Sequence, residues 1–367
     1  MKWIRSFSLL ILLTYLLLSG CNTTLGIKKQ QDNLRIPSWF INPVNKEVIG
    51  FIGAAAKYDS QGKINIAGSR KAALALLLTH HQLAFSGFDH AQLQSSAKLV
   101  LSQTHTVRFL PEFNHQGVIY SYATLEQNPF SLSQQQTLAH LSRCQFAQCS
   151  PSWLCDEKSN TITGVSFFTS SPSQQLSKAQ QNANLIANLL YQSQVNATEY
   201  LSQSGHEKLA IQSASFSQSS QVSAKTTRTN QLLLKNVCEY NSTLIGNFVL
   251  PEPAIKLAKD WQSQSIYQDR SLIQGRFGYG GQMSPDLLLS SAIELAIKDA
   301  LIELAKIKGI EIEQASSVTF NNGYYFISHS KMTVDEQVSG QLLDIKLSYQ
   351  QDHPIVNVWL LETKHPL

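Results

Sequence analysis

The sequence carries one short pattern three times, and this repetition constrains the fold more than any other feature. In the two clearer copies, Pro-Ser-Trp precedes a polar run, and a glycine stands eleven residues after the tryptophan. In the weaker third copy, the glycine follows after fourteen residues. The tryptophan and glycine of the copies are Trp39 and Gly50, Trp153 and Gly164, and Trp261 and Gly275. Such a repeated pattern indicates a repeated structural unit, so we expect three related units.

We place these units at residues 36–128, 129–253 and 254–367. In each, an apolar strand-like run is followed by a polar turn, a helix and further strands. The predicted helices span 67–84, 176–190 and 284–309. The predicted strands span 48–54, 97–101, 117–123, 161–169, 208–216, 231–237, 243–250, 272–279, 317–329, 342–349 and 355–361. A long helix followed by a strand meander is typical of α+β proteins. The prediction is therefore tandem α+β units, each with a long amphipathic helix packed on a mainly antiparallel sheet.

The glycines of the pattern stand in pairs three residues apart in two of the units. These pairs are Gly50 with Gly53 and Gly275 with Gly278, while the second unit retains Gly164 alone. A glycine inside a strand usually marks a close approach of another backbone. Because an alanine-rich helix follows each of these strands, we expect the glycines to let that helix lie close on the sheet. The tryptophan before the strand would then cover the end of the core.

The N-terminus has the organisation of a secretory signal. Lys2 and Arg5 precede an apolar run, Phe7–Leu18, which is short for a bilayer span. It ends at Leu-Ser-Gly followed directly by Cys21, which resembles the lipobox of bacterial lipoproteins. That resemblance implies that residues 1–20 are a lipoprotein signal peptide and that Cys21 is acylated. The alternative is an ordinary cleaved signal with a chance cysteine.

An acylated Cys21 predicts a tethered, exported protein. The three acyl chains of such lipoproteins exceed the two signals needed for stable anchoring. Asn22 follows the cysteine, where lipoproteins retained in the inner membrane carry aspartate, so the resemblance implies the outer membrane. The chain is expected to face the periplasm, with exposure at the cell surface as the alternative. Residues 21–35 have no apolar period and are predicted to be a flexible tether.

The size and charge of the mature chain exclude some classes of partner. Without residues 1–20, the remainder of the 367-residue chain suits two or three domains. The net charge of +4 falls by two when Lys2 and Arg5 leave, so no nucleic-acid partner is expected. No second apolar run approaches the length of a transmembrane helix.

Together these motifs resemble the LPP-twenty lipoprotein family of outer-membrane and flagellar accessory lipoproteins. The resemblance rests on Pro-Ser-Trp, the spacer, the strand with its glycines and the alanine-rich helix, and it covers most of the mature chain as three divergent units. It implies a non-catalytic structural or assembly factor of an envelope machine, with the flagellar basal body as the first candidate. The implied partners are the outer membrane, other envelope or flagellar proteins and a second copy of the chain.

Four further cysteines fall in or beside the second unit: Cys144, Cys149, Cys155 and Cys238. Their spacings fit neither a zinc knuckle nor a redox Cys-x-x-Cys pair. In an oxidising compartment they predict two disulfides with three possible connectivities. Our preferred pairing is Cys144 with Cys149 and Cys155 with Cys238, and the alternative is free buried thiols. A disulfide there would stabilise a thin core by ~2–4 kcal/mol.

No residue pattern in the chain indicates catalysis. There is no nucleophile elbow and no phosphate-binding fingerprint, because the glycines of 275–281 have the wrong spacing and predict a strand with a tight turn. His80 and His81 are expected in the last turn of the first helix and lack further metal ligands. We therefore expect no catalytic residue, no metal and no cofactor. The alternative is a periplasmic enzyme or ligand-binding lipoprotein with a cleft between units.

Overall fold

The computed structural model describes residues 36–44, 49–84, 87, 89–126, 137–138, 142–157, 160–166, 172–206, 211–225, 232–241, 243–253, 255–282, 289–320, 324–350 and 353–363. They belong to one compact body that combines helices with several antiparallel sheets, so the α+β class is confirmed. The predicted signal peptide, Cys21 and the tether 21–35 lie outside the described residues. The unit boundaries predicted near 128 and 253 remain predictions.

The N-terminal sheet has the strand order β2-β6-β4-β3, and β5 also pairs with β6. Its elements are α2 (Ser38–Ile41), β2 (Phe51–Ala56), α3 (Ile66–His80), α4 (His90–Ser95), β3 (Lys98–Val100), β4 (Thr106–Phe109), β5 (Phe113–His115) and β6 (Val118–Leu125). Helix α3 begins where the Asn65 side chain accepts a hydrogen bond from the N–H of Gly68. It packs on β2 and β6 through a buried face that includes Ala73, Leu74 and Leu77.

A second sheet has the order β12-β13-β9 and packs against α6. Its elements are β9 (Thr161–Val165), η3 (Pro172–Gln174), α6 (Gln175–Tyr191), β12 (Leu233–Tyr240) and β13 (Thr243–Val249). The apolar positions predicted for this helix recur at steps of three and four. Ala179, Ala183, Ile186 and Leu190 are buried, while Leu176 is half-buried at its start.

The C-terminal sheet has the order β14-β15-β19-β18-β8 and packs against α7. Its elements are β8 (Asp156–Glu157), β14 (Ile266–Tyr267), β15 (Arg270–Phe277), η5 (Tyr279–Gly281), α7 (Leu289–Lys308), β18 (Gly340–Gln350) and β19 (His353–Glu362). A two-stranded sheet pairs β1 (Ile36–Pro37) with β7 (Thr137–Leu138). The hydrophobic residues of α6 and α7 form one continuous core, so residues 160–250 and 272–360 do not have separate interiors.

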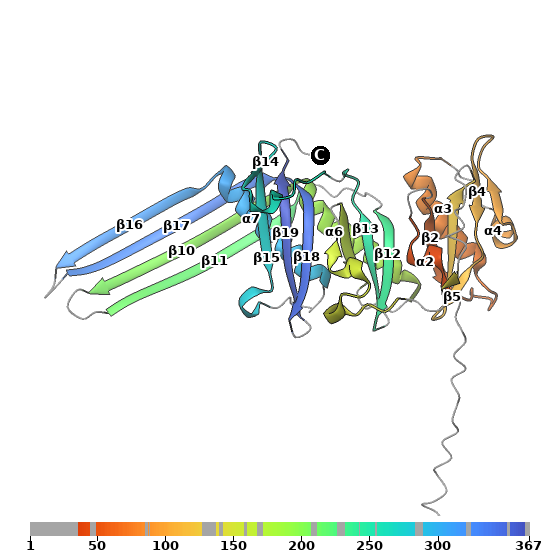
Figure 1. Cartoon of the computed structure of the whole chain (residues 1–367), viewed down its shortest axis with the longest axis horizontal. Coiled ribbons are helices and arrows are strands. Elements are labelled where there is room, and N and C mark those ends of the chain that lie inside the picture. The colour runs from red at the N-terminus through yellow and green to blue at the C-terminus, as the bar shows by residue number, and fades with distance from the viewer. Residues whose placement is uncertain are drawn as a thin grey trace, which may run out of the picture. The chain divides into compact units, whose positions relative to one another are not determined.

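These three sheets share one connectivity. In each, the strand before the helix pairs antiparallel with the last strand, namely β2 with β6, β9 with β13 and β15 with β19. The last strand also pairs with the strand just before it in the chain, β5, β12 or β18. Figure 1 shows the three sheets with their helices. A strand, a helix and a final antiparallel pair of strands therefore accompany all three copies of the sequence pattern.

A fourth sheet departs from the predicted organisation. It consists of two long hairpins, formed by β10 (Ser193–His206), β11 (Ile211–Ala224), β16 (Glu311–Phe320) and β17 (Tyr324–Val338). The strand order is β11-β10-β17-β16, and every pair is antiparallel (Figure 1). We call this four-stranded sheet the arm. Each hairpin follows one helix, the first α6 and the second α7.

Two sequence predictions in the arm are wrong. Strand β10 was not predicted, because its Ser, Gln and Asn residues hide the alternation of a strand, and its stability comes from pairing with β11 and β17. The strand predicted at 317–329 spans the end of β16 and the start of β17, so it is a hairpin. The strand predicted at 208–216 begins in residues outside the described ones and continues as β11.

Candidate functional site

Three glycines of the repeated pattern lie directly beneath helix backbones. A Cβ atom added at Gly53, Gly164 or Gly275 would stand 2.1 Å from a backbone atom of α3, α6 or α7. The nearest atoms are Ser69 O and Ala73 N in α3, Ala179 O in α6 and Ala296 O in α7. Only glycine allows these helices to approach their strands so closely, which is the packing role expected from the sequence.

In the first copy of the pattern, the glycine that corresponds to Gly164 and Gly275 is Gly53 and not Gly50, so the predicted alignment is wrong by three residues. Gly50 does not face the helix, because a Cβ there would meet the ring of Tyr122. Gly278 has φ of +92° and serves a turn before η5. The glycine beneath the helix therefore follows its tryptophan by fourteen residues in the first and third copies, from Trp39 and from Trp261. In the second copy this interval is eleven residues.

Gly164→Ala is expected to lower the free energy of unfolding by about 1–3 kcal/mol, because the new methyl group must push α6 away from β9. The measurement is urea unfolding followed by circular dichroism. Gly87→Ala is the matched control, since a Cβ at that position meets no atom within 4 Å, and its effect should stay below about 1 kcal/mol. Equal effects of the two substitutions would contradict the packing role.

All three motif tryptophans lie in single helical turns ahead of these strands. They occupy α2, η2 (Ser152–Leu154) and η4 (Trp261–Ser263). In the first two, an extended proline, Pro37 or Pro151, precedes the turn. Trp39 and Trp261 are buried, whereas Trp153 is half-buried. The three stretches thus have the same local structure but cover their cores to different extents.

The tryptophans differ in burial because different residues face them. The Trp39 ring lies 5.4 Å from that of Tyr122 on β6, and the Trp261 ring lies 5.8 Å from that of Trp359 on β19. Both partners stand one residue after the position paired with the helix-contacting glycine. In the second sheet Asn247 stands at that place. Trp153 therefore lacks the aromatic partner that its two counterparts have at this position.

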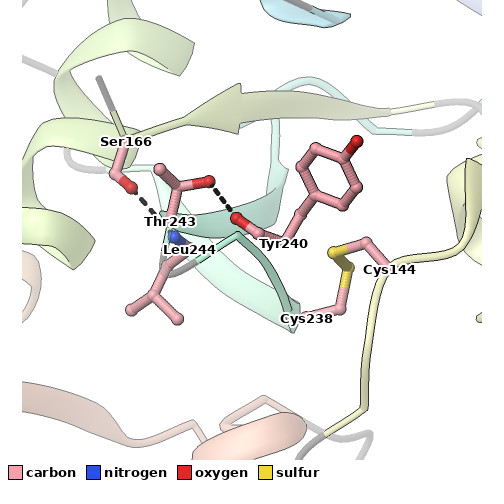
Figure 2. Close-up of a disulfide and its surroundings, with 6 residues drawn as sticks. All are labelled: Cys144, Ser166, Cys238, Tyr240, Thr243 and Leu244. Atoms are coloured by element: carbon pink, nitrogen blue, oxygen red, sulfur yellow. Dashed lines mark hydrogen bonds between the residues drawn. A yellow bond between two sulfur atoms is a disulfide. The ribbon is translucent and has the colours of Figure 1, made fainter. Parts of the chain in front are cut away.

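The four cysteines form two disulfides, as predicted, but the preferred pairing is wrong. Cys144 bonds to Cys238 (Figure 2). Cys149 bonds to Cys155. The cause is a strand-like contact between the residues before Cys144 and the end of β12. The N–H of Cys144 donates to the carbonyl of Glu239, whose own N–H donates to Ser142. Cys144 is thereby placed beside Cys238, and the two remaining cysteines close a short loop.

Glu239 also links β12 to the β5–β6 turn of the first sheet. Its carboxylate lies 3.2 Å from His115 Nε2 and accepts a 2.6 Å hydrogen bond from the Gln116 side chain. The hydrogen bond with His115 lowers the pKa of Glu239 against the opposing effect of burial, and Gln116 lowers it further. The charged carboxylate is therefore the form that this contact favours.

This contact predicts a loss of stability in acid. Because folding lowers the pKa of Glu239, its contribution is complete above the ordinary glutamate value of about 4.3 and disappears as the pH falls below it. Wild type should lose about 1 kcal/mol more than Glu239→Gln between pH 7 and about pH 3. Urea unfolding at several pH values measures the difference, with Glu313→Gln on the arm as control. Parallel pH profiles for wild type and Glu239→Gln would contradict it.

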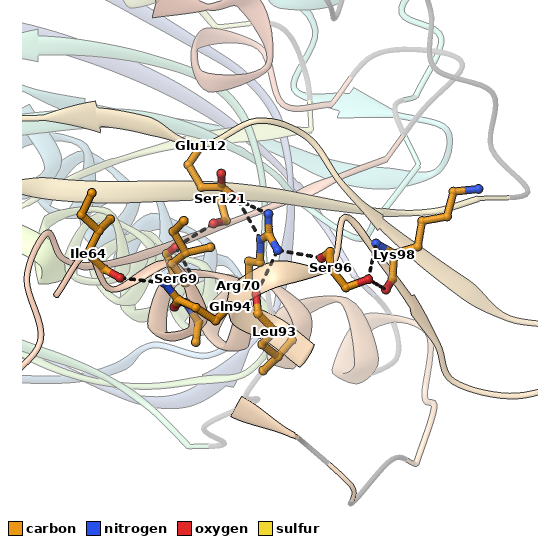
Figure 3. A network of polar contacts seen from close by, with 11 residues as sticks. Ile64, Ser69, Arg70, Leu93, Gln94, Ser96, Lys98, Glu112 and Ser121 are labelled. Carbon is orange, nitrogen blue, oxygen red and sulfur yellow. Dashed lines mark hydrogen bonds and ion pairs between the residues drawn. The ribbon is translucent and has the colours of Figure 1, made fainter. Parts of the chain in front are cut away.

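A buried ion pair between Arg70 and Glu112 connects elements around the N-terminal sheet (Figure 3). Arg70 of α3 donates to Glu112 at 2.7 Å and to the carbonyls of Leu93 and Ser96 at 2.9 and 2.6 Å. Its guanidinium also lies 5.1 Å from the centre of the Phe109 ring. These contacts join α3, the end of α4 and the loop before β5. Since the guanidinium is already bonded to protein groups, we assign Arg70 a structural role.

The described residues show no candidate metal centre. Among them, no group of three or more His, Cys, Asp or Glu side chains could hold a metal ion. His80 and His81 end α3, as predicted, beside the ring of Phe51, and burial lowers the pKa of both. No helix within the described ranges has the length and hydropathy needed to cross a membrane.

A cavity of about 190 Å³ lies where β2 and α3 meet α6 and β12. Its walls are mainly apolar, and they include Phe51, Leu76, Leu176, Leu234 and Phe248. The polar side chains are Ser173, Ser177 and Gln180, and Gln180 already donates to the carbonyl of Leu232 at 2.8 Å. The cavity therefore provides apolar volume without a convergent set of reactive groups.

The arm is held at one end and exposed along the rest. Val195, Ala197, Val334 and Val338 are buried in the core formed by α6 and α7. Lys306 of α7 bonds to Glu199 of β10 at 2.8 Å and to Glu303 at 2.9 Å. Burial opposes the charge of Lys306, but these two hydrogen bonds outweigh it and raise the pKa of the ammonium. The base of the arm is thus fixed to the body.

The exposed length of the arm has two different faces. Neighbouring positions across the strands share a face, so the register places five exposed apolar side chains on the same face of the arm. They are Leu201, Phe216, Ile312, Val318 and Phe326, between 37% and 67% exposed. The opposite face of β11 carries Ser213, Ser215, Ser217 and Ser219. The exposed face that carries these five side chains is a candidate interaction surface of the described chain.

Comparison with known proteins returned no relative: no family model matches the chain, and neither a curated protein nor a solved structure resembles it significantly.

Proposed function

We propose that this chain is a non-catalytic outer-membrane lipoprotein that acts as a structural or assembly factor of an envelope machine, the flagellar basal body being the first candidate. In this proposal it comprises three tandem units related to the LPP-twenty family, each with a long amphipathic helix packed on a mainly antiparallel sheet. Acylated Cys21 anchors it, and the chain faces the periplasm. Its partners are envelope or flagellar proteins.

The observation that carries this proposal is the arm. A long sheet with open edges and an apolar face is suited to binding other chains, and it projects from a body in which the motif residues serve packing. The shared connectivity of three sheets supports a repeat, and the two disulfides fit an oxidising compartment. The lipobox-like sequence before Cys21 supports export and anchoring.

The second candidate is a ligand-binding lipoprotein that uses the cavity beside Phe51 and Leu176. Its apolar walls favour a small apolar ligand over a charged one. A thermal-shift comparison of wild type with Leu176→Trp, which fills the cavity, would test it with small uncharged hydrocarbons such as benzene as probes. Stabilisation of wild type alone would favour this candidate. No shift in either protein would leave the scaffold proposal as the better account.

The proposed anchoring predicts that Cys21→Ser releases the full chain from membrane fractions and abolishes acylation, as read by mass spectrometry. Asn22→Asp is the matched variant, since an aspartate after the cysteine should move the lipoprotein to the inner membrane. Cys21→Ser protein that still sediments with the outer membrane, combined with an unacylated wild type, would refute the anchor.

The flagellar role requires a separate experiment in the organism of origin. Deletion of the chain should reduce swimming and leave incomplete basal bodies in electron micrographs, and the wild-type chain should restore both. Cells that swim normally and build complete basal bodies after the deletion would exclude the flagellum as the machine.

A further inference from the structure

The two outer strands of the arm lack the features that normally protect a sheet edge. Residues 211–224 of β11 contain no charged residue and no proline, and β16 has charges only at Glu311 and Glu313, near the base. The charges of the arm lie mainly on the inner strands, where β17 carries Lys331, Asp335 and Glu336. Native edges usually have the opposite arrangement, with charges or prolines on the outside.

The hydrogen-bonding groups of β11 can be assigned to the inside or the outside of the sheet. Lys225 donates its N–H to the carbonyl of Gln192, so that this pair is hydrogen-bonded. Hydrogen-bonded and non-hydrogen-bonded pairs alternate along an antiparallel ladder. The N–H of Ser219 therefore points to β10, and those of Gln218 and Ser220 point outward. In the part of the chain that the structure describes, no strand pairs with this outer side.

The direction of the strands decides which edges fit together. Because the four strands alternate in direction, β11 and β16 run in opposite directions. If two arms lie side by side with the same face up, β16 of one is antiparallel to β11 of the next. The face that carries the apolar side chains then continues across the junction. If Ser316 of one copy lies opposite Ala214 of the next, Ile312 lies diagonally across from Phe216.

We propose that copies of this chain associate through their arms, with β16 of one copy pairing antiparallel with β11 of the next. This contact is head-to-tail, and it pairs both edges of every copy with a single kind of interface. Pairing β11 with β11, or β16 with β16, leaves one edge of each copy open. The inference rests on the proposed scaffold function and adds to it: copies joined into one continuous sheet would form an extended, regularly repeating scaffold.

Cysteine cross-linking of the full chain, extracted in mild detergent, tests the pairing. Ala214 on β11 and Ser316 on β16 lie in the same row and on the same face of the sheet. The native cysteines of the described part are in disulfides. Two differently tagged variants, Ala214→Cys and Ser316→Cys, are co-expressed and treated with a short bismaleimide. We expect a mixed dimer, and multimers when one chain carries both substitutions.

The controls distinguish the possible arrangements. Ser215→Cys combined with Ser316→Cys places the thiols on opposite faces and should cut the yield at least about fivefold, because side chains alternate between faces. Ala214→Cys alone should give no dimer, since a dimer would mean that β11 meets β11. Such a homodimer, or a wild type that sediments as a monomer at micromolar concentration, would overturn the proposal.

Blocking the edge provides the second test. Gln218→Pro removes an outward N–H and should abolish the mixed dimer while keeping the unfolding midpoint near that of wild type. Ser219→Pro removes a bond to β10 and should lower the midpoint as well. If Gln218→Pro does not fold, Gln218→Lys places a charge on the same edge. A folded edge variant that still cross-links would refute the pairing.

The same measurements on Cys21→Ser protein separate this inference from the anchoring proposal. Association that persists in the released protein supports the arm contact whether or not the anchor exists. Loss of cross-linking in the released protein alone would mean that the membrane, and not the arm edges, brings the copies together, and would overturn the inference.

Discussion

Replacing Trp39 by alanine is expected to lower the free energy of unfolding by about 3–5 kcal/mol, the range for deleting a fully buried aromatic side chain. Trp39 is 2% exposed and packs against Phe40 and Tyr122. Its cluster also contains Val237 and Leu244 from the second sheet, so the cavity left behind would loosen both sheets. Urea unfolding of the purified chain measures the loss.

Trp153→Ala is the matched control, because Trp153 stands at the same place in the second copy of the pattern but is half-buried. Its loss should be smaller, about 1–2 kcal/mol, since the cost follows the apolar area already removed from water. A Trp39→Ala loss below that of Trp153→Ala would contradict the roles assigned to the two tryptophans.

Removal of the Cys144–Cys238 disulfide is expected to destabilise the chain by about 4–5 kcal/mol, because this bond closes a long loop and restricts the unfolded chain strongly. The sequence separation is 94 residues, against 6 for Cys149–Cys155. The double variant Cys149→Ala/Cys155→Ala should therefore lose only about 2–3 kcal/mol. Both double variants are compared with wild type by urea unfolding without reductant.

Two outcomes bear on this comparison. After full reduction of wild type, its stability should approach that of a chain lacking both bonds. If the short-loop variant proves as unstable as the long-loop variant, chain entropy does not account for the difference. Mass spectrometry of non-reduced digests should find the peptides of Cys144 and Cys238 joined.

The sequence was most informative where a pattern depends on local geometry. The helix around Ala179, Ala183 and Ile186 was predictable, because apolar spacing of three and four residues directly describes a helix face. The packing role of Gly164 was also predictable, since a glycine inside a strand that precedes an alanine-rich helix usually marks close packing of the two. The apolar residues that reveal this helix in the sequence are also the residues that it buries against the sheet.

Features that depend on distant pairing were not predictable. Cys144 lies beside Cys238 only because the residues before it run along β12, and nothing in the cysteine spacing reveals this. The sequence also did not reveal that Gly53, and not Gly50, lies beneath α3, because this depends on where the Tyr122 ring packs. In the arm, Ser, Gln and Thr are compatible with a strand or a loop, so their long-range partners decide the structure. The candidate interaction surface was therefore missed entirely.

The pairing of β10 with β17 at the centre of the arm sets the order in which the fold can form during synthesis. Ser193 of β10 pairs with Val338 of β17, so the two hairpins can join only after nearly the whole chain has emerged. In a polypeptide that emerges N-terminus first, the edge of β10 that faces β17 stays unpaired until residues up to 338 have emerged, even though β11 already covers its other edge. Such late, non-local contacts form slowly and leave the waiting strand open to aggregation. The first hairpin thus depends on timely delivery of the second, or on a chaperone that shields it during the interval.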